Sequence, residues 1–201
     1  MGKAARRGAD RRKQEMRTII SVESERWGRP GTALEARWIA ELLELPTVRV
    51  TRLPEEVLLS QGMVPKKCHL NCNKMAREDF TGETVHVPGW WISGPTLMLH
   101  SVVCIGGKHW GCITPQLVDA PGVFDFIPDP AIEWVSDDLG RMNLVREGQD
   151  LPVGLRVYPE RHVAMHQMFL NLVAAGVDPI EAYGQVDSSL GAELMLLPLR
   201  P

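Results

Sequence analysis

Two residues, Cys68 and His100, have the types and the spacing required for nucleophilic chemistry. Cys68 follows Lys66 and Lys67 and opens a stretch whose composition is compatible with a helix. A thiolate is favoured at the positive end of a helix and beside an imidazole. His100 lies within the apolar run 97–105, which predicts a strand that could hold the ring rigidly. We interpret the pair as a candidate nucleophile and base. His69 adjoins Cys68 in the sequence, but neighbouring positions of a helix diverge in direction, so His100 is the better candidate.

The residue that orients the imidazole should come from the return strand of a hairpin, and the hairpin register decides which residue it is. If Gly106 and Gly107 alone form the turn, His100 faces Ile113 and gains no polar partner. If the loop has three residues and begins one position earlier, His100 lies opposite Cys112, with Thr114 on the same face. The sequence leaves both registers open.

A set of short motifs surrounds these residues, and they occur in a fixed order along the chain. They are Cys-His-x-Asn at 68–71, Gly-Trp-x-Ile at 89–92, His-Ser-Val at 100–102, Ile-Thr-Pro at 113–115 and a closing Pro-Asp at 128–129. The order resembles that of a family of uncharacterised bacterial and phage proteins, whose Cys…His…(Asp/Thr) arrangement looks like that of papain-like and transglutaminase-like thiol hydrolases. The resemblance covers roughly residues 65–130. An acidic residue is expected before Ile-Thr-Pro, where this chain has Cys112.

The resemblance implies a papain-like or transglutaminase-like core and thiol-dependent acyl chemistry on a peptide-like substrate, as in a protease, a deamidase or an amidase. Cys68 would attack, His100 would exchange the proton, and Thr114 or Cys112 would orient the ring. The oxyanion donor would be the Cys68 amide or the side chain of Gln61. No cofactor is implied.

Trp90 and Trp91 are the candidate substrate-binding residues. Neighbouring residues of a strand point to opposite faces, so we expect at least one of the two rings to lie in the core. An alternative function is a non-catalytic binding module of the same fold, which holds a partner with the tail of the chain or with this Trp90/Trp91 surface. Cys112 in place of the acidic residue favours that alternative.

A structural zinc site is a further alternative, because cysteine and histidine pairs recur in the central stretch. The pairs are Cys68/Cys72, His100/Cys104 and His109/Cys112. Residues four apart on a strand are roughly 13 Å apart, too far for one ion. We therefore predict no metal, and in a reducing compartment we expect the four cysteines to be free thiols.

Two other clusters are better explained by structure than by chemistry. His162 and His166 are one helical turn apart but lack the glutamate of a His-Glu-x-x-His motif, so we expect them at the edge of the core. Asp125, Asp129 and Glu133 are spaced too loosely for a calcium loop.

The basic residues of the chain are concentrated at its start. Residues 1–17 carry a net charge of +5, so the total of −3 leaves −8 on the remainder. We expect a flexible basic arm over 1–17, and nucleic acid could bind only there. A peptide or protein is the expected partner of the rest, and the oligomeric state is not predicted.

Bulk composition indicates an ordinary globular protein, with 44% hydrophobic and 23% charged residues. No apolar run approaches the roughly 18 residues of a membrane span, and the start of the chain lacks a signal-peptide pattern. We expect no membrane partner and a cytoplasmic location.

The expected elements alternate between helices and strands, and they predict an α+β fold with a small antiparallel sheet packed on helices. Helices are expected after Thr32, after Cys68, from Glu160 to Gly176, and from Pro179. Strands are expected at 48–53, 85–92, 97–105, 109–113 and 123–127, with 136–154 mainly loop. Residues 18–22 could form a further strand or only the point where the basic arm docks. Residues 18–201 are expected to form one domain.

Overall fold

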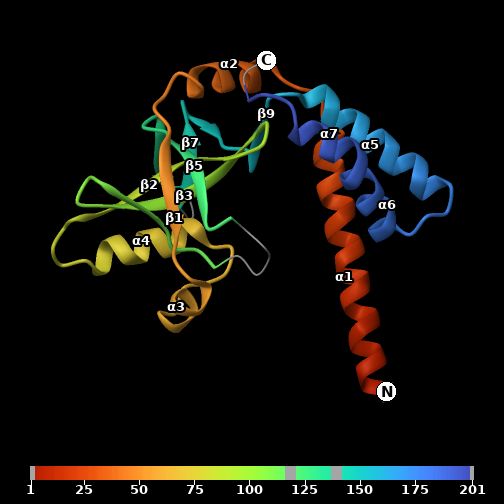
Figure 1. The fold of residues 1–201 in the computed structure, drawn as a ribbon, viewed down its shortest axis with the longest axis horizontal. Coiled ribbons are helices and arrows are strands. Elements are labelled where there is room, and N and C mark those ends of the chain that lie inside the picture. Colours follow the sequence, from red (N-terminus) through yellow and green to blue (C-terminus); the bar gives the residue numbers. More distant parts are fainter. Residues whose placement is uncertain (1–2, 116–120, 137–141, 200–201) are drawn as a thin grey trace. The chain divides into compact units, whose positions relative to one another are not determined.

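The computed structural model describes residues 3–115, 121–136 and 142–199, with side chains from residue 13 onward. The chain forms two compact units, which are described separately below (Figure 1). The barrel unit comprises Arg37–Leu155, and the helical unit comprises Met1–Ala36 with Arg156–Pro201.

Five strands of the barrel unit close into a barrel. They are β1 (Val48–Arg52), β2 (Thr84–Ser93), β3 (Thr96–Ile105), β4 (His109–Cys112) and β5 (Val123–Pro128). Their order is β2-β5-β1-β4-β3, and β2 pairs with β3 to close the ring. The pairs are antiparallel except β1 with β4, which is parallel. The α+β class is confirmed, but the prediction of a small antiparallel sheet is wrong, because β2 is long enough to pair with both β3 and β5.

One face of every barrel strand points inward. The interior cluster contains Val50, Val102, Cys112, Phe124 and Phe126, with Val87 of β2 packed against it. The opposite face of β3 and β4 packs Val103 and Ile113 against helices α3 (Glu55–Ser60) and α4 (Cys68–Glu78). Side chains of β3 therefore alternate between the barrel interior and the α4 side.

Gly89 lies where β2 is paired on both sides, opposite His100 of β3 and Pro128 of β5. A Cβ at this position would lie 2.2 Å from the carbonyl oxygen of Ile127. Glycine therefore permits the close approach of strands that closes the barrel.

A second sheet of the barrel unit contains β6 (Ile132–Ser136), β7 (Met142–Arg146) and β8 (Gln149–Asp150). The prediction of mainly loop over 136–154 is therefore wrong for the described residues, and its part at 137–141 lies outside them. Strand β7 turns into β8 through Glu147 and Gly148, both with positive φ, as a tight hairpin turn requires. A short strand (Gly154–Arg156, β9) extends the barrel sheet beside β3.

A buried charge network stabilises the region between the two sheets. Asp129 accepts hydrogen bonds from Trp90 Nε1 at 2.9 Å and from Arg146 Nε at 3.1 Å. Arg146 also pairs with Glu41, a residue of helix α2 (Ala33–Leu42). Buried charges need such partners because each loses its hydration on folding.

The helical unit packs α1 (Lys3–Trp27) against α5 (Pro159–Ala174) and α6 (Pro179–Val186), followed by a π-helical turn (Asp187–Gly191, η1) and α7 (Ala192–Met195). Its core contains Ile20, Met165, Phe169, Ala182, Val186 and Leu194. The prediction of a strand at 18–22 is wrong, because these residues continue α1 and Ile20 faces the helical core. The predicted cap at Thr32 is confirmed, since its hydroxyl accepts a hydrogen bond from the Glu35 amide.

Within the described residues, no helix has the length and apolar character needed to cross a membrane.

Candidate functional site

Cys68 is the first residue of α4, and a side chain one turn later fixes the loop that leads to it. The buried Asn71 amide bonds both the N–H and the C=O of Val64, at 2.9 and 2.8 Å. The N-cap residue Lys67 makes no side-chain hydrogen bond to the first turn, so the first backbone N–H groups of α4 can donate to another acceptor. The sequence Cys-His-x-Asn thus places a thiol where the helix dipole favours negative charge.

An open cavity of about 750 Å³ lies between the start of α4 and the second sheet of the barrel unit. Cys68 and His69 form part of its wall, and Lys66 and Lys67 lie at the same end. The remaining lining residues are Leu70, Asn73, Leu99, Trp134, Met142, Asn143, Leu144, Asp150 and Leu151. The cavity wall mixes apolar and polar side chains, with a thiol, an imidazole and two ammonium groups at the start of α4 and Asp150 in the second sheet.

Beneath this wall, the hydroxyl of Ser101 bridges two imidazoles. Its Oγ lies 2.6 Å from His69 Nδ1 and 2.7 Å from His86 Nε2. The indole of Trp134 covers both rings, at centroid distances of 6.0 Å to His69 and 5.7 Å to His86. The α4 face of the barrel therefore carries a hydrogen-bonded His69–Ser101–His86 network.

The hydroxyl of Ser101 has one proton, so it donates to one imidazole and accepts from the other. When it donates to His86, His69 Nδ1–H donates to Ser101 and the Nε2 lone pair of His69 stays free. Burial, with a smaller effect of His86, lowers the pKa of His69 to about 4. Burial also lowers the pKa of His86. Both rings are therefore neutral at pH 7, and the same burial makes each a weaker base than a free imidazole.

The thiol of Cys68 is partly buried, and burial raises its pKa above the ordinary value. Hydrogen bonds from the backbone of Ser101 and His69 act in the opposite direction without reversing the shift. Cys68 therefore rests as a neutral thiol at pH 7, beside amides that would stabilise the thiolate once it formed.

His100 lies on the other side of β3, inside the barrel. Its Nε2 is 3.4 Å from Cys112 Sγ, and its ring packs against Trp91 and Phe124. Burial, followed by the charge of Arg52, lowers the pKa of His100 to about 3. Among the residues that the structure describes, no hydrogen bond joins His100 to Cys68.

The hairpin register differs from both registers left open by the sequence. Ile105 pairs with His109 and Val103 with Gly111, so the turn contains Gly106, Gly107 and Lys108. Continued along the strands, this register aligns His100 with Thr114. The structure thus brings His100, Cys112 and Thr114 to one face and leaves Cys68 on the other.

The remaining predicted site residues do not line the cavity. Thr114 is buried, and its Oγ1 has no hydrogen-bond partner in the part of the chain that is described. Gln61 is exposed at the end of α3. Trp90 is sealed in the core against Asp129, as expected for one ring of the pair, and Trp91 packs with the barrel interior.

The candidate metal pairs form no cluster. Among the described residues, no three Cys, His, Asp or Glu side chains converge on a metal position. All four cysteines are free thiols, as expected. In the helical unit, His162 Nδ1 bonds the carbonyl of Tyr158, and His166 packs on Gly28, where a Cβ would lie 2.4 Å from the ring.

The predicted acidic cluster has separate structural roles. Asp125 pairs with Arg49 on the surface, and Asp129 belongs to the buried network with Arg146.

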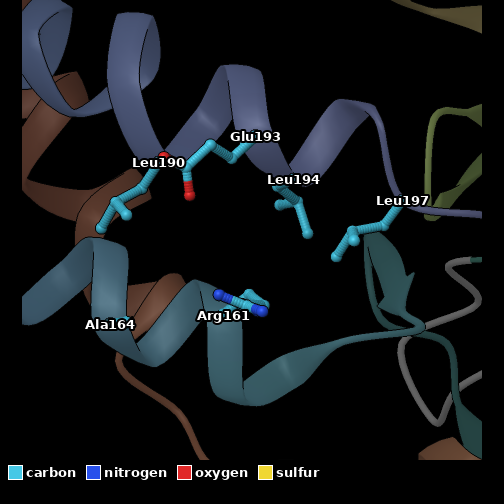
Figure 2. A pocket seen from close by; sticks show the side chains of 6 residues that line it. All are labelled: Arg161, Ala164, Leu190, Glu193, Leu194 and Leu197. Carbon is cyan, nitrogen blue, oxygen red and sulfur yellow. The ribbon is translucent and has the colours of Figure 1, made fainter.

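A second pocket, of about 100 Å³, lies within the helical unit between α5 and the η1–α7 segment (Figure 2). Its lining residues are Arg161, Ala164, Leu190, Glu193, Leu194 and Leu197. None of these six side chains is a nucleophile, so the pocket offers space for an aliphatic group and no covalent chemistry.

Sequence reasoning set His69 aside, because neighbouring positions of a helix diverge in direction, and it missed His86, Ser101 and Trp134. The available signal was strand alternation, since Ser101 and Val103 share the face of β3 opposite to that of His100 and Val102. Trp134 gave no such signal, because it reaches the cavity from a strand of the sheet that the sequence did not predict.

The fold and site define an α+β protein with a closed five-stranded barrel and a helix-terminal thiol in an open cavity. Comparisons of the chain with protein-family models, with curated proteins and with solved structures found no match.

Proposed function

We propose that the protein is a thiol-dependent acyl-transfer enzyme, with Cys68 as the nucleophile and a peptide-like amide or ester as the substrate. The observation that carries the proposal is the combination of Cys68 at the uncapped start of α4, in the wall of the 750 Å³ cavity, with a hydrogen-bonded imidazole network beside it. The resemblance to papain-like and transglutaminase-like hydrolases agrees with this proposal in its nucleophile, Cys68, and differs from it in the base, because His100 lies on the other face of β3.

Because the thiol and the imidazoles are neutral at pH 7, the proton must move as the sulfur attacks. In our proposal His69 Nε2 takes the proton of Cys68 while the S–C bond forms at the acyl carbon. Collapse of the tetrahedral intermediate breaks the bond between the acyl carbon and the leaving group, and His69 gives its proton to the leaving group. Water then hydrolyses the thioester and restores the thiol.

Within this proposal, Ser101 and His86 act as positioning residues for His69. The Ser101 hydroxyl fixes the orientation of the His69 ring. In the tautomer that leaves His69 Nε2 free, this hydroxyl donates its hydrogen bond to His86 Nε2. The first amides of α4 would hold the oxyanion, a role for which the sequence offered the Cys68 amide as a candidate. His100, the base expected from the sequence, becomes a residue of the barrel interior.

Acylation by p-nitrophenyl acetate tests the proposal. We expect a burst of nitrophenolate equal to the protein concentration and an acetyl group on the Cys68 peptide by mass spectrometry. The burst should vanish in Cys68→Ser and fall at least tenfold in His69→Ala. It should stay within about threefold in the barrel-interior variant His100→Met. Acetylation spread evenly over the four cysteines, or a burst unaffected by His69→Ala, would refute the mechanism.

A non-catalytic binding module is the second candidate, favoured by the raised pKa of Cys68 and the lowered pKa of His69. Such a module would bind peptides in the same cavity without acylation. Peptide binding that survives Cys68→Ser, together with no burst in the unmodified protein, would decide for it.

A further inference from the structure

The first half of α1 is a basic helix that extends beyond the packed part of the helical unit. The backbone is helical from Lys3 to Trp27, and the first half projects past α5 and α6 (Figure 1). Ile20 is buried in the helical core, and Arg17 pairs with Asp178 at the start of α6. The part that precedes Arg17 therefore projects from the core of its own unit.

The basic positions of this segment fall on one side of the helix. At 100° per residue, six of the seven lie within an arc of about 160°, which also contains Asp10. These six are Lys3, Arg6, Arg7, Arg11, Lys13 and Arg17. Because Arg17 pairs with Asp178, the phosphate contact depends on the other five, which span about 15 Å along the helix axis. A duplex presents one phosphate charge per ~1.7 Å of its own axis. The segment is therefore long enough to reach several phosphates.

This charge pattern is the reverse of what stabilises an isolated helix. Acidic residues favour the first turn because of the helix dipole, yet the first turn of α1 has none and begins with Lys3. Phosphates bound along the basic positions would neutralise both the side-chain charges and the positive helix end.

A membrane surface fits this segment less well than nucleic acid. A helix that lies in the bilayer interface needs a face of large apolar residues. Between residues 3 and 17 the only large apolar residue is Met16, and the others are charged, polar, alanine or glycine.

We propose that the first half of α1 binds the phosphate backbone of duplex nucleic acid without sequence specificity. The body of the chain, with its charge of −8, would be repelled by the same polymer, which confines the contact to this helix. The inference is independent of any activity at Cys68.

Fluorescence anisotropy of the full chain with a labelled 20-base-pair duplex tests the proposal. We expect micromolar affinity near 50 mM KCl and a log–log salt slope of about −4 to −5, corresponding to about five phosphate contacts. The double variant Arg7→Glu/Arg11→Glu should lose at least tenfold in affinity and reduce the slope by about 2. Helical circular dichroism at 222 nm should increase on binding.

The matched control is Arg77→Glu/Lys108→Glu, which makes the same change of net charge at exposed positions of the barrel unit. It should change the affinity less than threefold. Equal losses in both variants would overturn the proposal, as would a slope near zero. Tighter binding to phosphatidylserine vesicles or to polyglutamate than to the duplex would also overturn it, in favour of a membrane or an acidic protein partner.

Discussion

Replacing Ser101 by alanine removes one hydroxyl that serves two imidazoles. The change leaves His69 Nδ1 and His86 Nε2 without their partner, at positions 2.6 and 2.7 Å from the lost oxygen. An unsatisfied buried polar group costs about 1–3 kcal/mol. Both rings are only partly buried, and water from the cavity can reach His69. We therefore take the low end of this range for each ring and expect the unfolding free energy to fall by about 2–3 kcal/mol in total.

Thr114→Val is the matched control, since it also deletes a fully buried hydroxyl from the barrel sheet region. Thr114 Oγ1 has no hydrogen-bond partner among the described residues, so its desolvation is uncompensated. Exchange of this hydroxyl for a methyl group of similar volume should be neutral or stabilise by about 1 kcal/mol. The changes in unfolding free energy of Ser101→Ala and Thr114→Val should therefore have opposite signs or differ by about 2 kcal/mol or more.

Urea unfolding followed by tryptophan fluorescence measures both, because five of the six tryptophans belong to the barrel unit. The midpoint should fall in Ser101→Ala without a change in the m-value. A loss below about 0.5 kcal/mol in Ser101→Ala would show that the hydroxyl does not hold the two rings. An equal loss in Thr114→Val would show that burial, and not hydrogen bonding, sets the cost.

Three further changes test the fold around the site. Asp129→Asn should destabilise the protein by about 3 kcal/mol, because it leaves the Arg146 charge without its buried partner. Asp125→Asn, at an exposed ion pair, should cost under 1 kcal/mol. Urea unfolding midpoints compare the two variants, and equal costs would contradict a stabilising role for the buried pair. Gly89→Ala should lower the melting temperature by 10 °C or more, since its Cβ would meet backbone at 2.2 Å; a shift of less than about 2 °C would contradict the close strand approach. Because burial lowers the pKa of His69 to about 4, this group contributes stability that is present above pH 6.5 and lost as the pH falls toward 4. Its contribution to the unfolding free energy should differ by about 1–2 kcal/mol between pH 7 and pH 5. His69→Gln should remove this part of the pH dependence, and an unchanged pH dependence would contradict the assignment.

Much of the barrel could be predicted from sequence because its strands carry the alternation that a buried face imposes. The run 97–105, followed by two glycines and a second apolar run, predicted the existence of the β3–β4 hairpin correctly but not its register, because Lys108 joins the two glycines in the turn. Ring closure could not be read in the same way, since it depends on β2 pairing with β5, some thirty residues later in the chain. No local pattern encodes a pairing at that separation.

The second sheet was missed for a related reason. Its strands are short, with five residues in β6, five in β7 and two in β8, and the glycines and charged residues between them favour turns. Propensity is a weak guide when one side of a strand faces an open cavity. β7 also supplies Arg146 to the buried carboxylate of Asp129, a tertiary contact that no local sequence pattern indicates.

The choice of base depends on a difference of one position on β3. His100 and Ser101 are adjacent, and strand geometry sends their side chains to opposite faces. Hydrophobic burial fixes which face is which, because Val102 belongs to the barrel interior and Val103 packs against Cys72 of α4. A shift by one residue would expose one of these valines, at a cost of about 1.5–3 kcal/mol. The register that protects the core therefore places Ser101, and not His100, on the face that carries Cys68, and any proton transfer from that thiol must use groups on the same face.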